Sequence, residues 1–340
     1  MKKILVTGGL GYIGSHTVVE LIEHGFEVVI IDDLSNSKKQ VLYNIEKITG
    51  VLPELYQGDI KCRQVLKLIF TQHVFDGVIH FAAFKSVSES QTNPLEYYDN
   101  NINGLVTLLY MMKQFKVQNL IFSSSCTVYG QANKMPIKES TPLKLCESSY
   151  GKTKQMGEQI IEDFVKAYNK KACLLRYFNP IGAHKSGLLG ELPNGVPNNL
   201  VPFVLQTAIG IRECLNIWGD DYPTDDGTAV RDYIYVGDLA LAHLAALLKL
   251  LKEDRTSLLD IYNLGTGRGT SVLEIVKTFE KVTKQKVNYI IGPRRQGDIT
   301  IAYADASLAE KELNWKATTG IEQSLLTAWQ WQLNLNEYLH

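Results

Sequence analysis

The sequence predicts an α/β fold with a doubly wound parallel sheet, followed by a smaller mixed α/β domain. Short apolar, β-branched runs alternate with amphipathic helical stretches through about the first half of the 340 residues, which is the pattern of βαβ units. A glycine-rich turn joins the first run to the first helical stretch, as in Rossmann-type domains. After Asn179-Pro180, Gly, Pro and Asn become frequent. We therefore expect one domain over 1–180 and a second over 181–340.

The periodicity of apolar residues places the individual elements. Short apolar runs indicate strands, and apolar residues at three- and four-residue steps indicate helices. In the first domain we expect strands at 3–7, 27–31, 52–57, 77–81, 119–123 and 172–177, and helices at 12–24, 62–72, 96–115 and 150–169. Beyond residue 180 we expect helices at 239–251, 271–284 and 320–334, the first of which is apolar enough to pack back onto the first domain.

Charge and cysteine content exclude several classes of partner. The 35 basic and 36 acidic residues give a net charge of -1, without a long run of either sign. Such a balance offers no electrostatic footprint for a nucleic acid or a membrane surface, and no apolar stretch reaches transmembrane length. The five cysteines are scattered and show no metal-ligand spacing. We expect a reduced, cytoplasmic chain without a metal, whose partner is a small molecule.

The turn after the first strand has the composition of a dinucleotide site. Gly8, Gly11 and Gly14 lie in the stretch Gly8-Gly9-Leu10-Gly11-Tyr12-Ile13-Gly14, directly before a helix. A pyrophosphate needs a tight turn, close backbone approach and the free N–H groups of a helix N-terminus. We therefore predict that Gly8, Gly11, Tyr12, Ile13 and Gly14 contact the phosphates of NAD.

The second strand ends at Asp32-Asp33, eighteen residues past Gly14. A carboxylate there accepts hydrogen bonds from the adenine ribose and repels a 2′-phosphate, which favours NAD over NADP. Lys38 and Lys39 lie nearby and keep NADP open as an alternative.

Two further strand ends suit the same cofactor. Gly58-Asp59-Ile60 follows the third strand and is placed for a contact to adenine through Asp59 and Ile60. Phe81-Ala82-Ala83 follows the fourth strand and offers small residues for close approach of a ligand. We expect Asp59, Ile60, Phe81 and Ala82 to line the NAD site.

Tyr150 and Lys154 lie four residues apart, a spacing that puts both on one face of a helix. A phenol ordinarily titrates near pH ~10, and a neighbouring ammonium favours the phenolate. The pair could therefore provide a general base. The fifth strand ends in Ser123-Ser124-Ser125, at the edge where parallel sheets bind ligands. We predict that one hydroxyl of this serine run, together with Tyr150 and Lys154, handles a proton beside the nicotinamide.

Polar residues of the second domain suit a diphosphate. Arg231 and Arg295 are permanent cations able to clamp it, Asn198 and Asn199 offer amide groups, and Asp298 can accept from a hydroxyl group.

Together these motifs resemble those of the extended short-chain dehydrogenase/reductase family, and within it the nucleotide-sugar 4-epimerases. The resemblance covers nearly the whole chain. Beyond the glycine turn, the serine run and Tyr-x-x-x-Lys it rests on five stretches: Leu95-Glu96-Tyr97-Tyr98-Asp99-Asn100-Asn101, Arg176-Tyr177-Phe178-Asn179-Pro180, Pro197-Asn198-Asn199-Leu200, Asp226-Gly227-Thr228-Ala229-Val230-Arg231-Asp232-Tyr233 and Pro293-Arg294-Arg295-Gln296-Gly297-Asp298. Several of them lie outside the cofactor domain.

The resemblance implies reversible epimerisation at carbon 4 of UDP-glucose or UDP-galactose, through a 4-keto sugar and with tightly bound NAD. Tyr150 would be the base, Ser125 would bond the reacting oxygen, and Lys154 would lower the tyrosine pKa and bridge the nicotinamide ribose. The resemblance also places Lys85, Asn100 and Tyr177 near the cofactor. It surrounds the UDP-sugar with Phe178, Asn179, Asn198, Asn199, Leu200, Arg231, Tyr233, Arg295 and Asp298.

One position bears on the choice of sugar. Relatives restricted to plain hexoses have a bulky tyrosine four residues after the aspartate of the Arg-Arg-x-Gly-Asp stretch, and here that residue is Ala302. We expect that N-acetylated sugars, UDP-GlcNAc and UDP-GalNAc, also fit. The alternative is that Tyr303 fills the same space.

Other functions remain as alternatives. A 4,6-dehydratase would need carboxylates before Val128-Tyr129-Gly130, and the residues there supply none. A UDP-glucuronate 4-epimerase or decarboxylase is not excluded by residue type. A non-catalytic NAD-sensing protein would be expected to lack Ser125, Tyr150 or Lys154.

Relatives of this kind commonly form homodimers through the helices expected here at 96–115 and 150–169. The apolar faces of these helices allow such pairing, although they could equally belong to the core of a single chain.

Overall fold

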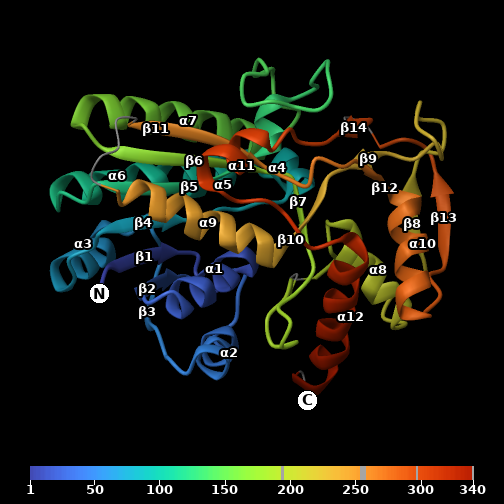
Figure 1. Ribbon diagram of the computed structural model, residues 1–340, viewed down its shortest axis with the longest axis horizontal. Helices are drawn as coiled ribbons and strands as arrows, with labels where there is room; N and C mark the ends of the chain where they lie inside the picture. The colour runs from blue at the N-terminus through green and yellow to red at the C-terminus, as the bar shows by residue number, and fades with distance from the viewer. Residues whose placement is uncertain (193–194, 253–257, 296–297, 339–340) are drawn as a thin grey trace.

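The structure is a computed structural model that describes residues 1–192, 195–252, 258–295 and 298–338. Figure 1 shows a large layered part, which contains the N-terminus, and a smaller part formed mainly by the second half of the chain. The C-terminal helix α12 (Ile321–Tyr338) lies in the smaller part.

A seven-stranded parallel sheet forms the centre of the larger part. The strands occur in the order β11-β6-β5-β4-β1-β2-β3, and all six pairs are parallel. Because the order reverses between β1 and β4, their carboxyl ends border a crevice of the kind that binds ligands. The strands are β1 (Lys3–Thr7), β2 (Glu27–Asp32), β3 (Glu54–Gln57), β4 (Gly77–His80), β5 (Asn119–Ser125), β6 (Lys171–Tyr177) and β11 (Leu259–Leu264).

Helices cover both faces of the sheet, so most strands are buried apolar runs. One face packs against α1 (Tyr12–Glu23), α2 (Gln40–Thr49), α9 (Val236–Leu250) and α11 (Ser307–Leu313). The other packs against α3 (Arg63–Gln72), α6 (Gly104–Gln114) and α7 (Ser149–Tyr168). Between β4 and α6 lie α4 (Val87–Thr92), α5 (Pro94–Tyr98) and a π-helical turn, η1 (Asp99–Asn103), and the 3-10 turn η2 (Cys126–Tyr129) follows β5.

The smaller part packs around its own apolar core, which includes Val204, Phe279 and Leu325. Its helices are α8 (Leu200–Ala208), α10 (Val272–Thr283) and α12. Its strands are short: β7 (Asn179–Ile181), β8 (Leu215–Trp218), β9 (Val230–Arg231), β10 (Tyr233–Tyr235), β12 (Thr270–Ser271), β13 (Tyr289–Gly292) and β14 (Ile301–Ala302).

The structure confirms the expected α/β fold and refines its elements. The helix expected at 96–115 is divided into α5, the π-helical turn and α6. Helices α2, α4 and α11 and strand β11 of the larger part were not anticipated, and neither were helix α8 and the short strands of the smaller part. Because α9, β11 and α11 all pack on the first sheet, the chain crosses back from the smaller part after residue 235.

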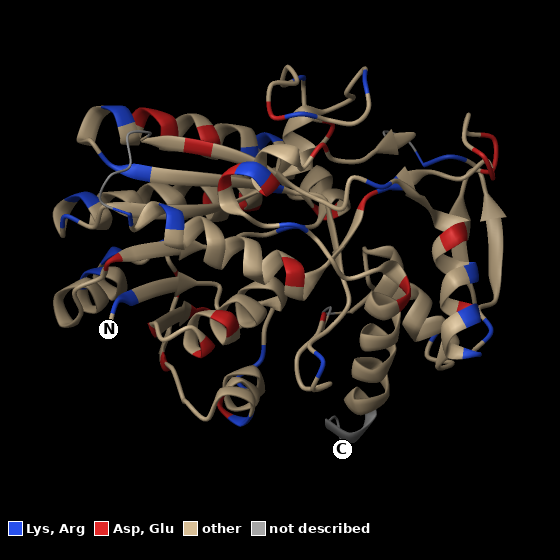
Figure 2. Cartoon of the chain, in the orientation of Figure 1, with Lys and Arg blue, Asp and Glu red and all other residues tan. Residues whose placement is uncertain are grey.

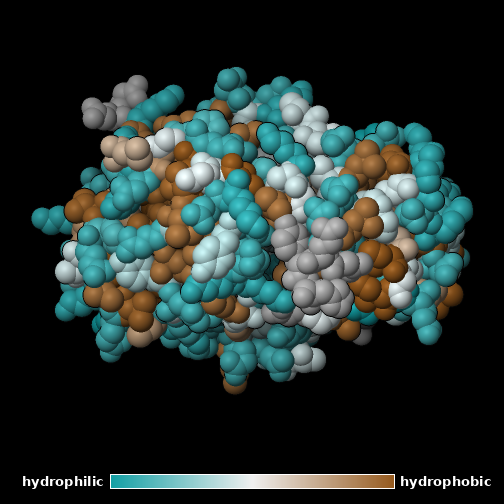
Figure 3. Space-filling model, turned by 90° about the horizontal axis from the view of Figure 1, so that it is seen from below, coloured by the Kyte–Doolittle hydropathy of each residue, from teal (hydrophilic) through white to brown (hydrophobic). Residues whose placement is uncertain are grey.

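Figure 2 shows basic and acidic residues interspersed over both parts of the molecule. On the face seen in Figure 3, hydrophobic and hydrophilic groups are also intermixed. Among the helices of the described ranges, none combines the length and the apolar character that crossing a membrane requires.

Candidate active site

The glycine turn has the shape that a pyrophosphate requires. Gly8 has φ +69°, and a Cβ there would lie 2.8 Å from the backbone nitrogen of Ala82. A Cβ on Gly14 would lie 2.2 Å from the carbonyl oxygen of Gly8. Helix α1 begins after Gly11 without a side-chain cap. Its first N–H groups, including those of the predicted contacts Tyr12 and Ile13, therefore remain available to an anion.

Asp32 anchors this turn from the end of β2. Its carboxylate is buried and accepts hydrogen bonds from the backbone N–H groups of Leu10 (3.0 Å) and Leu34 (3.0 Å) and from the Ser37 hydroxyl (2.7 Å). Burial raises its pKa, although these bonds oppose the change. Asp33 is exposed and accepts from Ser35 within its own turn. Of the two predicted ribose acceptors, Asp32 is therefore the one beside the glycine turn.

The strand-end residues predicted for NAD lie at the same edge of the sheet. The N–H groups of Phe81 and Ala82 both donate to the Thr7 carbonyl, at 3.0 and 3.1 Å, which fixes the end of β4 against the glycine turn. Asp59 accepts from the backbone of Lys61 at 2.7 Å after β3, and Ile60 is buried.

Tyr150, Ser125 and Lys154 are brought together by β5 and the first turns of α7. Helix α7 begins at a Ser148 cap, whose hydroxyl accepts from the N–H of Gly151 (3.1 Å). The Tyr150 phenol is in hydrogen-bonding contact with Ser125. Lys154 Nζ donates to the carbonyl of Ser123 (2.6 Å) and lies 5.8 Å from the Tyr150 ring centre. The structure thus places the predicted trio in one cluster.

The electrostatics of the trio differ from the sequence-based expectation. Burial raises the pKa of Tyr150 to about 12, opposed by its bond to Ser125, and Lys154 is not among the main influences. Burial lowers the pKa of Lys154 to about 8, opposed by Glu158. Removal from water disfavours the charged form of both groups. In the chain by itself the ammonium therefore does not make the phenol basic.

Two of the residues predicted near the cofactor, Tyr177 and Asn100, lie on elements next to this cluster. Tyr177, at the end of β6, shares a hydrogen bond with the Ser123 hydroxyl, and burial raises its pKa. Asn100 is buried in the π-helical turn and donates to the side chain of Asn101 (3.0 Å). Asn101 in turn donates to Thr153 (3.0 Å), so the turn is tied to α7 between Tyr150 and Lys154.

Arg231, Arg295 and Asp298 converge from the smaller part. The Arg231 guanidinium donates to Asp298 (2.7 Å), and Arg295 donates to the same oxygen (3.3 Å). Ala302, which pairs in register with Arg231, belongs to one apolar cluster with Val128 of the turn that directly follows Ser125. The two cations therefore lie on the same side of the molecule as the proton-handling cluster. Gln296 and Gly297 of this stretch lie outside the described residues.

The other predicted sugar contacts lie on neighbouring short strands. Asn179 on β7 pairs with the buried Tyr233 on β10, and its N–H donates to the Asp232 carbonyl (3.0 Å). Phe178 and Ala302 are both buried and belong to one apolar cluster with Val128.

Asn198, Asn199 and Leu200 lie at the start of α8, where the two parts of the molecule meet. Asn198 donates to the hydroxyl of Ser86 (3.1 Å), across the gap between the parts. Glu191 accepts both from Asn199 (2.8 Å) and from Lys85 (2.8 Å), which joins a predicted sugar contact to a predicted cofactor contact.

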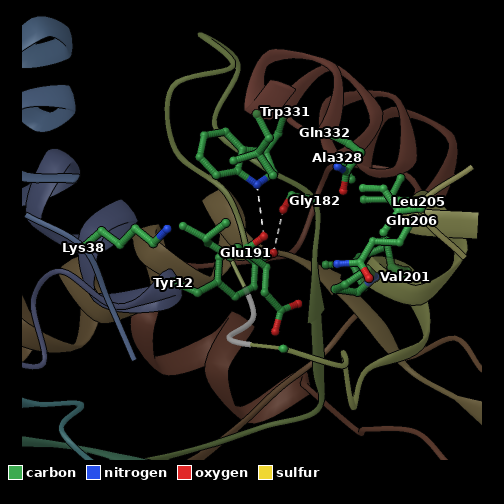
Figure 4. Close-up of a pocket in the computed structure, with 16 residues that line it drawn as sticks. Tyr12, Lys38, Gly182, Glu191, Val201, Leu205, Gln206, Ala328, Trp331 and Gln332 are labelled. Atoms are coloured by element: carbon green, nitrogen blue, oxygen red, sulfur yellow. Dashed lines mark hydrogen bonds between the residues drawn. The ribbon is translucent and has the colours of Figure 1, made fainter. Parts of the chain in front are cut away.

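A cavity of about 260 Å³ lies beside this junction. Figure 4 shows Tyr12, Glu191 and Trp331 around it, with Lys38 reaching in from the loop between β2 and α2. The Tyr12 hydroxyl donates to the Gly182 carbonyl (2.6 Å), and the Trp331 ring donates to the Glu191 carbonyl (3.0 Å).

Sequence reasoning missed three side chains of the site. Tyr222 is buried, its hydroxyl has no hydrogen-bond partner among the described residues, and it interacts electrostatically with Arg231, Arg295 and Asp298. Glu191 accepts hydrogen bonds from Asn199 and Lys85, and Glu158 interacts with Lys154. Neither glutamate belongs to one of the sequence motifs on which the site was predicted. The position of Glu158, four residues after Lys154 on the same helix face, could have singled it out.

Known proteins resemble the chain over nearly its full length. Residues 5–327 match the family described as GDP-mannose 4,6 dehydratase. The UDP-glucose 4-epimerase of Erwinia amylovora is 50% identical over 333 residues, covering 97% of each chain.

Solved structures agree with this relationship. The UDP-glucose-4-epimerase of Stenotrophomonas maltophila, with bound NAD and formylated UDP-arabinopyranose, is 46% identical at a TM-score of 0.96, covering 99% of this chain and 100% of that one. The Bifidobacterium longum enzyme, in complex with NAD+ and UDP, is 46% identical at a TM-score of 0.94, covering 98% of each. The chain therefore belongs to this broad family of nucleotide-sugar enzymes, the extended short-chain dehydrogenase/reductases, and within it to the UDP-glucose 4-epimerases.

Proposed function

We propose that the chain catalyses the reversible epimerisation at carbon 4 of a UDP-hexose, UDP-glucose or UDP-galactose, with NAD as its cofactor. The observation that carries this is the pairing of two clusters. A proton-handling group, Tyr150 with Ser125, lies at the carboxyl edge of a dinucleotide-type sheet. A cationic group, Arg231 with Arg295, is held by Asp298, and Ala302, the register partner of Arg231, packs with Val128 of the turn that follows Ser125.

The glycine turn, Asp32 and the strand-end residues fit NAD. The backbone of Gly8 to Gly14 leaves helix N–H groups for a pyrophosphate, and Asp32 is held next to that turn. When bound, NAD supplies the acceptor and donor of hydride at carbon 4 of the sugar and a positive charge near Tyr150. Lys85, Asn100 and Tyr177 complete the cofactor side in this proposal.

Tyr150 is the general base of the proposed reaction. It takes the proton from the hydroxyl on carbon 4 and returns it to the other epimer, while Ser125 holds the same oxygen. Its pKa of about 12 in the chain alone is too high for a base at neutral pH. Two positive charges, those of Lys154 and the oxidised cofactor, together favour the phenolate.

Epimerisation requires that the sugar turn over between two hydride transfers. Arg231 and Arg295 hold the diphosphate throughout, because a guanidinium keeps its charge and binds phosphate oxygens through paired N–H groups. Asn179, Asn198, Asn199, Leu200 and Tyr233 line the path of the nucleotide and the sugar, with Phe178 and Ala302 as apolar walls. Anchoring the nucleotide and leaving the hexose free permits the turnover.

This assignment divides the chain by ligand. Residues 1–180, with α9, β11 and α11 packed on their sheet, bind NAD in this proposal, and the remainder of 181–340 binds the UDP-sugar.

The test is an assay of purified protein with UDP-galactose. We expect conversion to UDP-glucose without a stoichiometric change in nicotinamide absorbance, since the hydride is returned. Stoichiometric oxidation or reduction of added cofactor would identify a dehydrogenase instead. Tyr150→Phe should reduce kcat by about 10² to 10⁴-fold, the usual contribution of a positioned base; a Phe variant with most of its activity would disprove the role of Tyr150.

We further propose that UDP-GlcNAc and UDP-GalNAc are substrates. Ala302 is a small wall in the apolar cluster that contains Phe178. The ring of Tyr303 lies instead beside Gly269, where a Cβ would approach it to 3.3 Å. That position argues against the alternative in which Tyr303 fills the space next to Ala302.

We propose that the active form is a homodimer that pairs α6 and α7 of two copies. Many apolar residues of these helices belong to the core of the chain itself, such as Leu108 and Phe164. Others remain exposed, including Tyr110, Met156 and Tyr168. Analytical ultracentrifugation should give twice the chain mass, and Met156→Glu should shift the protein towards the monomer. The five cysteines are scattered along the sequence without metal-ligand spacing, and from this we propose a reducing compartment, the cytoplasm.

A further inference from the structure

A buried ion pair lies beneath the proton-handling cluster. Glu158 on α7 accepts two hydrogen bonds from Arg176 on β6, one from Nε (2.9 Å) and one from Nη2 (2.6 Å). Their side chains are only 6% and 4% exposed. Removing two charges from water costs free energy, and a buried pair is tolerated when its geometry is bidentate and its other lone pairs are bonded. This pair has both properties.

Glu158 also ties α7 to the strand that carries Ser125. Its carboxylate accepts from the Ser124 hydroxyl, and one turn earlier Lys154 donates to the Ser123 carbonyl (2.6 Å). Two successive residues of β5, directly before Ser125, are therefore held by two successive turns of α7. Because Tyr150 lies one further turn back on the same face, these bonds set the position of Tyr150 relative to Ser125.

Arg176 extends the network to the turn beyond Ser125. Its Nη1 donates to the Tyr129 hydroxyl (3.0 Å), and Tyr129 donates to Asn263 (2.7 Å). Tyr129 is the last residue of the 3-10 turn that begins directly after Ser125. Ser125 is thus held from both sides, by Ser124 before it and by Tyr129 after it.

We propose that Glu158, held by Arg176, is a positioning residue for the reaction: it aligns Ser125 with Tyr150 and retains the positive charge of Lys154. This inference rests on the proposed epimerase function. Glu158 itself is not assigned a contact with substrate or cofactor, and it acts through the three residues above it.

The charged groups around Lys154 give the sign of the effect. Helix α7 contributes Tyr150 and Glu158, and β6 contributes Arg176, which is paired with Glu158. On β4, burial and the nearby Lys154 lower the pKa of His80 to about 3, so this histidine is uncharged. Glu158 therefore provides the negative charge that favours the ammonium. Without that charge, Lys154 loses its proton at lower pH, and the positive charge that assists Tyr150 is lost earlier.

The experiment compares kcat and KM for UDP-galactose between pH 6 and 10 in the wild type, Glu158→Gln and Glu158→Asp. For Glu158→Gln we expect the high-pH decline of kcat to move down by about one unit and kcat at pH 8 to fall by about fivefold. KM should stay within about twofold, because the UDP contacts are untouched. Glu158→Asp keeps the charge, so the decline should remain where the wild type has it.

Glu162→Gln is the matched control. Glu162 lies one turn further along α7 and pairs with Lys166 at the surface (2.6 Å), with both side chains exposed. The same chemical change there should leave the pH profile unaltered. If the Glu158→Gln profile coincides with that of the control, the inference is wrong.

Ser124→Ala covers the case in which Glu158→Gln does not fold. It removes the hydrogen bond between β5 and Glu158 without a change in charge. We expect kcat to fall several-fold at constant KM, while the high-pH decline of kcat stays at the same pH as in the wild type. Wild-type kcat in this variant would overturn the positioning role. Absence of epimerisation in the wild type would instead disprove the proposed function, so the two failures are distinguishable.

Discussion

Nη2 of Arg231 lies 2.7 Å from Oδ1 of Asp298, and Arg295 donates to the same oxygen at 3.3 Å. The first contact joins residues 67 positions apart in the chain. One carboxylate oxygen thus binds two guanidinium groups, and guanidinium groups are the usual partners of phosphate oxygens. Arg231 is mostly buried, whereas Arg295 is exposed, so Arg231 has the more fixed geometry of the two.

Arg231→Gln should weaken the binding of the UDP-sugar. Hydrogen bonds to charged groups contribute about 1.5–3 kcal/mol, so we expect KM to rise by about 10 to 100-fold while bound NAD is unchanged. Arg268→Gln, at an exposed position paired with Glu274, serves as the control. Steady-state kinetics with UDP-galactose give the KM of both variants. An unchanged KM for Arg231→Gln would show that Arg231 does not bind the diphosphate.

Ala302→Tyr should separate the two classes of sugar. The larger side chain occupies the volume that an N-acetyl group needs, so turnover of UDP-GalNAc should be lost while turnover of UDP-galactose persists. Ala302→Ser changes the volume little and should keep both activities. No turnover of UDP-GalNAc by the wild type would contradict the wider specificity; equal loss of both activities in Ala302→Tyr would mean that the tyrosine damages the site as a whole.

The rate should fall as the pH rises through about 8. Burial lowers the pKa of Lys154 to about 8, so its ammonium is present below that pH and lost above it. The Lys154 ammonium favours the phenolate form of Tyr150, which is the base. When the ammonium loses its proton, the phenolate is no longer favoured, and the rate falls. A kcat profile recorded at saturating UDP-galactose tests this, and a rate that is constant up to pH 10 would exclude a titrating Lys154.

Tyr222→Phe should raise KM with little change in kcat. The hydroxyl of Tyr222 is buried, has no partner in the part of the chain that the structure describes, and interacts electrostatically with Arg231, Arg295 and Asp298. There it can donate to the nucleotide. One neutral hydrogen bond contributes about 0.5–1.5 kcal/mol, which corresponds to about a two- to twelvefold rise in KM. Tyr289→Phe, at an exposed ring, should have the KM of the wild type. If the two variants have the same KM, the Tyr222 hydroxyl does not bind the nucleotide and the ring serves only in packing.

Gly14→Ala should reduce the NAD content of the purified protein. The added Cβ would lie 2.2 Å from the Gly8 carbonyl oxygen, so the turn that faces the pyrophosphate must shift. Gly320→Ala is the control, because a Cβ there meets nothing within 4 Å. Stoichiometric NAD in both variants, measured after denaturation and release, would show that the turn tolerates the change.

The sequence predicted the parts of the fold that depend on local pattern. Strands β1, β2, β4, β5 and β6 are apolar runs that are buried on both faces, so their composition identifies them without a partner. Helix α2 was missed although Leu42 and Ile45 are buried at a three-residue step. Strand β11 is defined by its register with β6, and the short strands β9 and β14 by each other, which no local pattern contains.

By itself, the sequence determined the glycine turn, the position of Asp32 at the end of β2 and the spacing of Tyr150 and Lys154, because each is a local relation along one strand or helix. Only the tertiary structure decided which distant groups meet. It joined Glu158 to Arg176, placed Tyr222 among the arginines and put Tyr303 beside Gly269. The sequence predicted a lowered pKa for Tyr150, whereas burial raises it. The reason is that burial depends on all the segments packed around a side chain, and the spacing of residues along one helix does not contain that information.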